Sequence, residues 1–221
     1  MIVFAIAGKS AAGKDTISNI VSEKLNIPKI ISYTTRPPRP GEVNGKDYNF
    51  ISEDKMMELK NKGLLANYTE YKVSDNGEKV WRYAYLNEDL NKGDCIMVLN
   101  PQGLEDIRKL ISNRNSNDPF REDRDKVVTL LVEASLEERI KRSLKRDNTK
   151  IVEMVRRAIA DEQDFKNLFY NYIIDTSNNN IKECANFVEK LFRNEMALEL
   201  VLKTQKDFMR DPQKFINGGS N

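Results

Sequence analysis

Gly8-Lys9-Ser10-Ala11-Ala12-Gly13-Lys14-Asp15-Thr16 is the stretch of sequence that decides the fold. It follows an apolar run, residues 2–7, and precedes a helical pattern of apolar residues, 17–25. A strand, a glycine-bearing loop and a helix in this order are the context that a phosphate-binding loop requires. Glycines let successive backbone N–H groups point at a polyphosphate, and Lys14 adds a full positive charge. The other interpretation of this stretch is a flexible turn between two core elements.

The composition is that of a globular chain with a well-charged surface: of 221 residues, 39% are hydrophobic and 32% are charged. This length suffices for one large α/β domain, or for one domain with an appendage. The net charge of +2 gives no general attraction to nucleic acid. No apolar run approaches the ~20 residues of a membrane span. The run at residues 2–7 is short and lacks a basic leader, so we interpret it as a buried strand and not as a signal peptide.

The chain has two cysteines, Cys95 and Cys184, and no histidine. The cysteines lie far apart in the sequence, which favours reduced buried thiols in a cytoplasmic protein over a disulfide. Without histidine, neither a Ser-His-Asp arrangement nor a histidine metal site can form. Any chemistry must therefore use lysine, arginine, carboxylates, hydroxyls and a bound metal ion.

A proline-rich segment, residues 34–48, carries Arg36 and Arg39. The prolines at 37, 38 and 40 exclude a helix or a central strand, so we predict a stiff loop that presents both guanidinium groups outward. A preorganised guanidinium loses less entropy when it binds an anion. The segment alone is equally consistent with a surface loop that carries its arginines incidentally.

Apolar periodicity and turn residues predict the remaining elements. Beyond the first strand, strands are expected at 29–33, 64–71, 80–86, 95–99, 127–132 and 172–175. Helices are expected at about 52–62, 104–111, from 135 onward, at 156–169 and at 181–192, with a turn at 75–77 and an exposed polar loop at 112–125.

Arg146 and Arg157 bracket a short break between two basic helical segments and could reach one anion together. Charge runs on helices are more usually solvated faces, and this remains the alternative.

Residues 194–221 look like an extension of the domain, because Leu198, Val201, Leu202 and Met209 share helical spacing. We expect this amphipathic helix to dock on the core rather than on a partner. Residues 217–221 are expected to be disordered.

Residues 32–48, Ser-Tyr-Thr-Thr-Arg-Pro-Pro-Arg-Pro-Gly-Glu-Val-Asn-Gly-Lys-Asp-Tyr, closely resemble the nucleotide-binding segment of guanylate kinases, and the similarity extends from the loop to about Phe192. The resemblance implies an α/β fold, in which a P-loop NTPase-like parallel sheet is flanked by helices. An inserted NMP-binding subdomain would occupy about 33–90 and a helical lid about 136–157. The domain would span 1–193, with 194–221 as a C-terminal helical extension. The implied reaction is ATP + GMP giving ADP + GDP, with Mg²⁺.

The resemblance also assigns roles, position by position. The residues that would bind ATP belong to the loop: Gly8, Ser10, Ala11, Ala12, Gly13, Lys14, Asp15 and Thr16. The residues that would hold GMP come from the inserted subdomain: Arg36, Arg39, Tyr48 and Tyr83 at the phosphate, and Ser32 and Glu70 at the guanine. The catalytic cations would be Lys14, Arg36, Arg39 and the lid arginines Arg146 and Arg157.

These roles suit the chemistry. Phosphoryl transfer needs in-line positioning and neutralisation of charge, which arginine, lysine, backbone amides and magnesium supply. A glutamate accepts hydrogen bonds from the N1–H and N2–H₂ groups of guanine, and a serine hydroxyl can donate to O6. Adenine offers no such pair of neighbouring donors, so a buried carboxylate would reject it.

Three positions depart from the family pattern. Asp15 stands where the family has a small or hydroxyl residue that helps to bind magnesium. The strand end Asp-Ile-Asp of the family is Val98-Leu99-Asn100 here, without a carboxylate. The family's Tyr-Gly-Thr or Tyr-Gly-Ser is Tyr83-Ala84-Tyr85.

A carboxylate beside a triphosphate is repulsive unless a cation lies between them. We therefore hypothesise that Asp15 supplies the magnesium-directed charge that the strand end has lost. The alternative is that Asp15 caps the helix and points away from the metal. We expect Tyr85 to crowd the base site and GMP or dGMP to be the best acceptor.

Two other functions fit the sequence. One is a catalytically weakened guanylate-kinase-like module that binds phosphorylated ligands, which the missing strand-end carboxylates favour. The other is a P-loop kinase of another (deoxy)nucleoside monophosphate or of a sugar phosphate. The intact Gly8, Gly13, Lys14 and Thr16 favour an enzyme. The expected partners are small-molecule substrates, with no nucleic acid and no membrane, and both a monomer and a homodimer fit the sequence.

Overall fold

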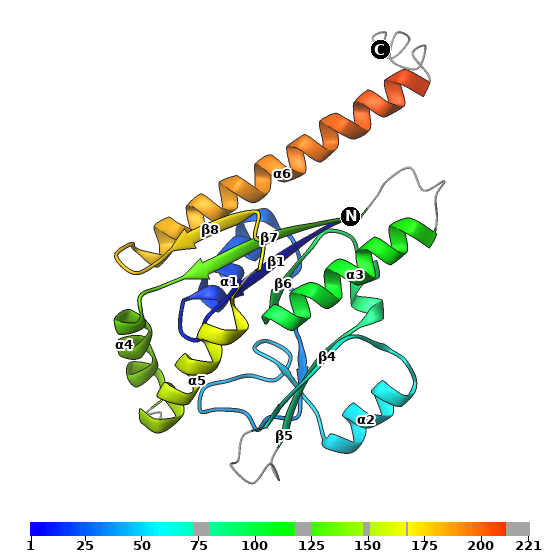
Figure 1. Cartoon of the computed structure of the whole chain (residues 1–221). Helices are drawn as coiled ribbons and strands as arrows, with labels where there is room; N and C mark the ends of the chain where they lie inside the picture. Colours follow the sequence, from blue (N-terminus) through cyan, green and yellow to red (C-terminus); the bar gives the residue numbers. More distant parts are fainter. Residues whose placement is uncertain (73–79, 118–124, 148–150, 167, 211–221) are drawn as a thin grey trace.

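The computed structural model describes residues 1–72, 80–117, 125–147, 151–166 and 168–210, with the backbone alone at 146–147, 151–154, 157 and 206–210. Figure 1 shows the elements, whose bounds are β1 (Ile2–Gly8), α1 (Lys14–Leu25), β2 (Tyr33–Thr34), β3 (Asn49–Phe50), α2 (Glu53–Asn61), β4 (Leu65–Lys72), β5 (Val80–Leu86), the 3₁₀ helix η1 (Asn87–Asn91), β6 (Cys95–Leu99), α3 (Pro101–Asn117), β7 (Lys126–Glu133), α4 (Leu136–Asp147), α5 (Ile151–Asp164), β8 (Tyr172–Asp175) and α6 (Ile181–Arg210).

The larger sheet is parallel, with the strand order β6-β1-β7-β8. Every residue of β1 is buried, and Phe4 pairs with Ile96 on one side and with Val128 on the other. Strands that are buried on both faces consist of continuous apolar runs, which is why this sheet could be predicted. The carboxyl ends of its strands share one edge, and the loop at residues 8–14 leaves from the central strand there.

Helices cover both faces of this sheet, as the fold class predicted (Figure 1). On one face α1 and α6 pack on the sheet, and the ring of Phe192 stacks on that of Phe4 with centroids 4.1 Å apart. On the other face α3 contributes Leu104 and Ile107 to a second apolar cluster. The glycine loop is therefore anchored to a rigid three-layer body.

A smaller sheet lies between α1 and β6 in the sequence, with the strand order β3-β2-β5-β4. Strands β4 and β5 are antiparallel, and Glu70 pairs with Arg82 while Thr69 pairs with Tyr83. Helix α2 begins after Ser52, whose hydroxyl accepts a hydrogen bond from the backbone N–H of Lys55, as predicted. In Figure 1 this sheet and α2 form the lower part of the molecule. The turn expected at 75–77 lies outside the described residues.

Several expected bounds are wrong. Helix α3 runs to Asn117, where a loop from residue 112 was expected, and α5 covers Ile151–Asp164 instead of 156–169. The expected strand at 29–33 is reduced to a bridge between Lys29 and Ile96 and the short β2. These differences leave the order of the elements unchanged.

The C-terminal helix differs most from expectation. α6 is one continuous helix over Ile181–Arg210, without a break near residue 194. Its second half extends away from the body (Figure 1), and Leu198, Leu200 and Val201 are each at least half exposed. The expectation that this segment docks on the core is therefore wrong for these residues. Among the described residues, no helix combines the length and apolarity needed to cross a membrane.

Candidate active site

Two glycines shape the loop that joins β1 to α1. A Cβ atom on Gly8 would lie 2.4 Å from the carbonyl oxygen of Val132, so only glycine lets β1 and β7 approach this closely. Gly13 has a φ of 100°, in the left-handed region that favours glycine, immediately before α1 begins at Lys14. The loop therefore delivers backbone N–H groups and Lys14 to the N-terminus of a helix, where anions bind.

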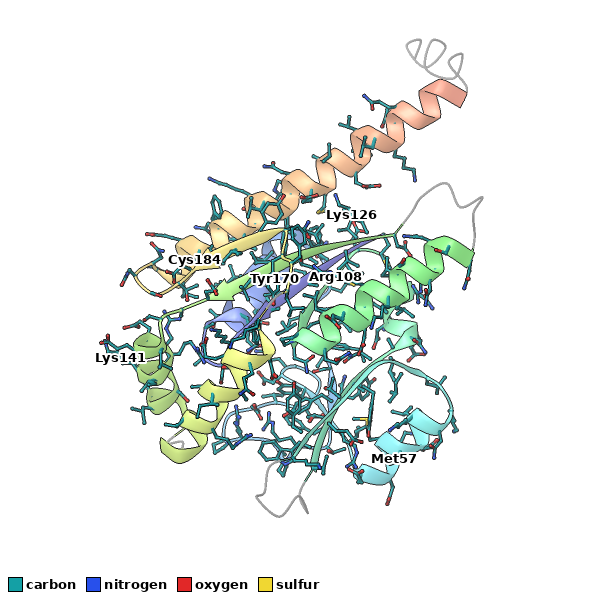
Figure 2. All side chains as sticks on the ribbon, viewed as in Figure 1. Met57, Arg108, Lys126, Lys141, Tyr170 and Cys184 are labelled. Carbon is teal, nitrogen blue, oxygen red and sulfur yellow. The ribbon has the colours of Figure 1, made fainter. Side chains whose placement is uncertain are left out.

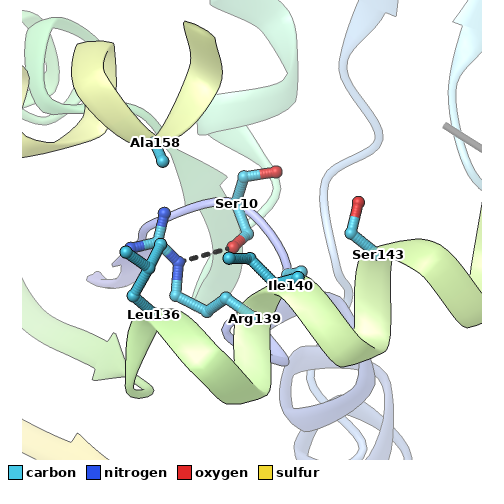
Figure 3. Close-up of a pocket in the computed structure, with 7 residues that line it drawn as sticks. Ser10, Leu136, Arg139, Ile140, Ser143 and Ala158 are labelled. Carbon is cyan, nitrogen blue, oxygen red and sulfur yellow. Dashed lines mark hydrogen bonds between the residues drawn. The ribbon is translucent and has the colours of Figure 1, made fainter. Parts of the chain in front are cut away.

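Arginines from α4 hold this loop from outside. Arg139 Nε donates to the carbonyl oxygen of Ser10 at 2.9 Å (Figure 3), and Arg142 Nη1 donates to that of Ala12 at 3.3 Å. The hydroxyl of Thr176 also donates to Ala12, at 2.8 Å. The sequence pointed to α4 as basic, but it carried no signal that separates these loop-binding arginines from solvated ones.

A carboxylate occupies one N–H group of the loop. Asp161 Oδ2, on α5, accepts a hydrogen bond from the backbone N–H of Ser10 at 2.8 Å and from Arg139 Nη2 at 2.6 Å. Burial raises the pKa of Asp161, and the Ser10 N–H and Arg139 oppose this shift. Next to it, Glu162 pairs with Lys9. The loop thus already binds an anionic group through its backbone, as a phosphate-binding loop does.

Lys29 connects the loop to the arginine-bearing segment. Its Nζ lies 4.0 Å from Asp15 Oδ1 and 2.8 Å from Asn19 Oδ1. Burial lowers the pKa of Lys29, the charges of Asp15 and Asp47 oppose this, and Lys14 adds to it. Residues of the loop and of the segment at 34–48 therefore lie close enough to act on one ammonium group. The side chain of Asp15 is 61% exposed, and Thr16 is exposed.

Arg36 is held rigidly within its segment and is only 4% exposed. Its Nη2 donates to both carboxylate oxygens of Glu42, at 2.8 and 2.9 Å, and its Nη1 donates to the carbonyl oxygen of Pro37 at 2.7 Å. Burial works to lower the pKa of Arg36, but the hydrogen bond with Glu42 raises it overall. Glu42 also accepts from the backbone N–H of Arg39 at 2.7 Å, so one carboxylate fixes the positions of both arginines in the chain.

Aromatic rings continue from Arg36 toward the larger sheet. The guanidinium carbon of Arg36 lies 5.1 Å from the centre of the Tyr48 ring, and the ring centroids of Tyr48 and Tyr83 are 5.9 Å apart. Tyr71 packs edge-on against Tyr83 at 5.6 Å and accepts a hydrogen bond from Asn100 at the end of β6. Burial raises the pKa of Tyr48, so its phenol stays neutral and can donate to an anion. The structure thus brings together Arg36, Tyr48 and Tyr83, three of the residues that the resemblance assigns to the phosphate of the acceptor.

Tyr85 does not crowd an open site. It is 5% exposed, packs in the apolar cluster beneath α3, and donates a hydrogen bond to the carbonyl oxygen of Val98 at 2.6 Å. The antiparallel register Tyr33–Ala84 places Ser32 beside Tyr85, and burial, opposed in part by a hydrogen bond with Ser32, raises the pKa of this phenol. Ser32 therefore lies at the inner end of the aromatic wall, the row of rings formed by Tyr48, Tyr83 and Tyr71.

Glu70 lies elsewhere. Its cross-strand partner is Arg82, and its carboxylate accepts hydrogen bonds from Tyr68 and, at 3.2 Å, from Arg82 Nε. Tyr68 in turn contacts Met57 and Lys60, so this face of the small sheet looks toward α2, near the position of Met57 in Figure 2. Tyr83 pairs with Thr69, the residue before Glu70, and cross-strand partners share a face. Because side chains alternate along a strand, Glu70 and Tyr83 lie on opposite faces of the sheet. The structure therefore does not bring Glu70 to the predicted guanine site.

The remaining predicted residues are the lid arginines. Arg146 lies at the end of α4 and Arg157 in the first part of α5, and their side chains lie outside the described residues. Groups of three or more acidic, cysteine or histidine residues that could hold a metal ion by themselves are absent from the described parts of the chain.

The parallel sheet, the glycine loop between its central strand and α1, and the inserted subdomain define a P-loop kinase fold. The chain belongs to the guanylate kinase family, whose model matches residues 2–195. A curated guanylate kinase from Wolbachia pipientis is 31% identical over 195 residues, which is 86% of this chain and 90% of that protein. One from Lactobacillus johnsonii is 37% identical over 113 residues, half of this chain.

A solved structure supports the same fold. The crystal structure of guanylate kinase from Anaplasma phagocytophilum superposes with a TM-score of 0.58 at 21% identity, and the match covers 88% of this chain and 85% of that one. At this identity the likeness concerns the fold. Membership of the guanylate kinase family, and not this structural likeness, establishes the enzyme class, which is nucleoside monophosphate kinase.

Proposed function

We propose that this chain transfers the terminal phosphoryl group of ATP to GMP or dGMP, releasing ADP and the diphosphate. The proposal depends above all on the position of Lys29. Its ammonium group lies 4.0 Å from the carboxylate of Asp15, and the negative charge of Asp47, in the arginine-bearing segment, acts to raise its pKa. The phosphate-binding loop would bind the donor nucleotide, and the adjacent group of Arg36, Tyr48 and Tyr83 would bind the acceptor nucleotide.

In the proposed reaction the chain acts by positioning. The loop amides and Lys14 hold the phosphates of ATP, and Arg36, Arg39, Tyr48 and Tyr83 hold the phosphate of the acceptor in line with them. Arg146 and Arg157 are proposed to neutralise charge on the transferred group. The pairing of Arg36 with Glu42 keeps one guanidinium in place before the substrate arrives, so little conformational entropy is lost on binding.

The donor set at the start of α1 fits magnesium. Mg²⁺ is usually bound by one or two carboxylates together with substrate phosphates and water, and Asp15 and Thr16 offer one exposed carboxylate and one exposed hydroxyl beside the loop. When bound, the ion would neutralise charge on the phosphates. Asp15 is proposed as its protein ligand.

We further propose a domain over residues 1–193, with its NMP-binding insertion at about 33–90 and its lid at about 136–157, and residues 194–221 as an extension. The free, buried thiols of Cys95 and Cys184 support a cytoplasmic location.

A second function is a module that binds phosphorylated ligands without catalysis, and Val98 and Asn100 at the end of β6 favour it. ADP release from ATP, measured with a panel of nucleoside monophosphates, separates the two. We expect turnover with GMP or dGMP, and loss of ATP binding and turnover in Lys14→Ala. ATP-independent binding of a phosphorylated ligand, without ADP release for any monophosphate, would establish the module instead.

A further inference from the structure

The face of the small sheet that looks toward α3 and β6 carries amides where a carboxylate was expected. Asn67 pairs across the strands with Tyr85, so its side chain shares the face of Tyr85 and Tyr83, whereas Glu70 leaves on the opposite face. Asn67 is 6% exposed. Asn100, at the end of β6, lies against Tyr71 of the same face. These two amides border the inner end of the wall that begins at Arg36.

The orientation of the Asn67 amide is fixed by its neighbour on α3. Asn67 Nδ2 donates to Asp106 Oδ2 at 2.9 Å, while Gln102 Nε2 donates to the other oxygen of that carboxylate at 2.8 Å. An ionised carboxylate only accepts hydrogen bonds, so the nitrogen of Asn67 must face Asp106. Its carbonyl oxygen Oδ1 is therefore the atom turned away from Asp106, and it is an acceptor.

The Asn100 amide is fixed in the same way by a backbone group. Asn100 Oδ1 accepts the N–H of Gly103 at 2.6 Å and so caps α3, whose second residue is Gln102. Its nitrogen then faces Tyr71, to which it donates one hydrogen. An amide nitrogen carries two hydrogens, so Asn100 retains a second donor. Gly103 allows this packing, because a Cβ there would lie 2.9 Å from Asn100 Oδ1 and 3.3 Å from Asn67 Nδ2.

We propose that the neutral amides of Asn67 and Asn100 read the base of the acceptor, and that the site accepts 6-oxopurine monophosphates with or without a 2-amino group. This inference rests on the proposed function. The pair offers one acceptor and one donor, which match the N1–H and O6 groups that guanine and hypoxanthine share. Recognition of the 2-amino group would need a further acceptor, and Glu70, the carboxylate expected to supply it, faces α2.

The energetic reason lies in what an absent group leaves behind. A carboxylate that binds both N1–H and N2–H₂ of guanine is left with an unpaired charged oxygen when the 2-amino group is missing, and such sites discriminate strongly. A neutral amide oxygen that binds N1–H alone loses nothing when the 2-amino group is missing. The 2-amino group therefore contributes little to selection by this chain.

The direct test compares the kcat/KM of the wild-type chain for GMP and for IMP, which differ only in the 2-amino group, with ATP as donor. We expect the two values to agree within about tenfold. A preference for GMP of more than about tenfold would overturn this inference while leaving the proposed function in place. Failure with GMP, dGMP and IMP alike would instead refute the proposed function.

Exchanging the amide of Asn67 and the carboxylate of Asp106, which share one hydrogen bond, tests the role of Asn67 directly. The double variant N67D/D106N keeps the volume, the net charge and a donor–acceptor pair at this contact, but moves the carboxylate from α3 to β4. We expect it to raise the ratio of kcat/KM for GMP over IMP by about tenfold or more. An unchanged ratio would contradict the role of Asn67.

Two single variants complete the design. Asn100→Asp retains the cap of α3, since aspartate is an equally good capping residue, but it replaces the donor to O6 by an acceptor and is expected to lower kcat/KM for GMP and IMP alike. Glu70→Gln is expected to keep the KM for GMP within about twofold, because its partner is Arg82 on the α2 side. A large rise in that KM would return base recognition to Glu70 and overturn the inference.

Discussion

Asp161 accepts a hydrogen bond from the backbone N–H of Ser10 at 2.8 Å, although the two residues are separated by most of the chain. The same carboxylate accepts from Arg139 at 2.6 Å, and Arg139 in turn donates to the carbonyl oxygen of Ser10 at 2.9 Å. The peptide groups around Ser10 are thus held at both their N–H and their C=O by side chains of α4 and α5. The shape of the loop depends on these helices as well as on its glycines.

Removing this carboxylate should destabilise the fold. In Asp161→Ala, Arg139 would keep its charge at 5% side-chain exposure without its main partner. We expect a loss of about 2–4 kcal/mol in the free energy of unfolding, measured by urea denaturation, since breaking a buried pair leaves an uncompensated charge. The matched control is Glu162→Ala, whose carboxylate is 60% exposed and should contribute less than about 1 kcal/mol. Equal losses in the two variants would contradict this assignment.

Ala11 gives a prediction in the opposite direction. Its φ is 60°, a left-handed conformation that costs a residue with a Cβ about 1–2 kcal/mol. Glycine adopts this conformation freely but has more entropy to lose on folding. We expect Ala11→Gly to raise the free energy of unfolding by about 0.5–1 kcal/mol in thermal or urea unfolding.

The neighbouring alanine is the control for this change. Ala12 is fully buried, and its φ is outside the positive region. Ala12→Gly is therefore expected to destabilise the chain by about 1 kcal/mol, from lost apolar burial and added chain entropy. Destabilisation by Ala11→Gly of similar size would show that its backbone is not strained.

Glu42 predicts how stability depends on pH. Burial works to raise its pKa, but hydrogen bonds from Arg36 and from the Arg39 N–H bring it below 4.5 overall. Because the unfolded chain binds this proton more readily, the contribution of Glu42 is present above pH 4.5 and is lost as the pH falls through its lower folded-state pKa. We expect Glu42→Gln to be less stable than wild type by about 1–3 kcal/mol at pH 7, with the gap closing in acid. A gap that stays constant down to pH 3 would contradict this account.

The proposed role of Asp15 predicts that the magnesium dependence of activity changes when this one residue is replaced. If its carboxylate is the protein ligand of the ion, Asp15→Ala should shift the magnesium concentration at half-maximal activity upward by about tenfold, since few other ligands hold the ion. The control is Asp47→Ala, which removes the other carboxylate that acts on Lys29 and should leave that midpoint in place. An unchanged magnesium dependence in Asp15→Ala would refute compensation for the lost strand-end carboxylates.

The strands β1 and β6 of the larger sheet could be predicted because each is an unbroken apolar run, such as Cys95–Leu99, that leaves few alternatives. The end of α3 could not, because its polar residues near 112–117 are poor helix formers. There Asn115 exchanges two hydrogen bonds of 2.9 Å with the backbone of Asp125, and these bonds tie the end of the helix to the start of β7. Local propensity says nothing of such a partner.

The site shows the same limit. Arg36, Tyr48 and Tyr83 could be placed together only because the family resemblance assigns all three to one phosphate. The face of the sheet on which Glu70 lies could not be predicted, because a shift of one residue in the alignment of a strand moves every side chain to the other face. Only the pairing of Glu70 with Arg82, and of Asn67 with Tyr85, fixes which polar group lies toward α3. Arg139 and Asp161 were missed because each depends on a contact across more than a hundred residues.

One helix carries two regimes of sequence constraint. Up to Met196, α6 is part of the packed interior, and any change of volume at Phe192 would be felt by Phe4 in the central strand. A few residues later the same helix faces water, with Leu200 at 65% exposure. Tolerance measured at one end therefore cannot be carried to the other, and a mutational scan of this single element should divide sharply at its midpoint.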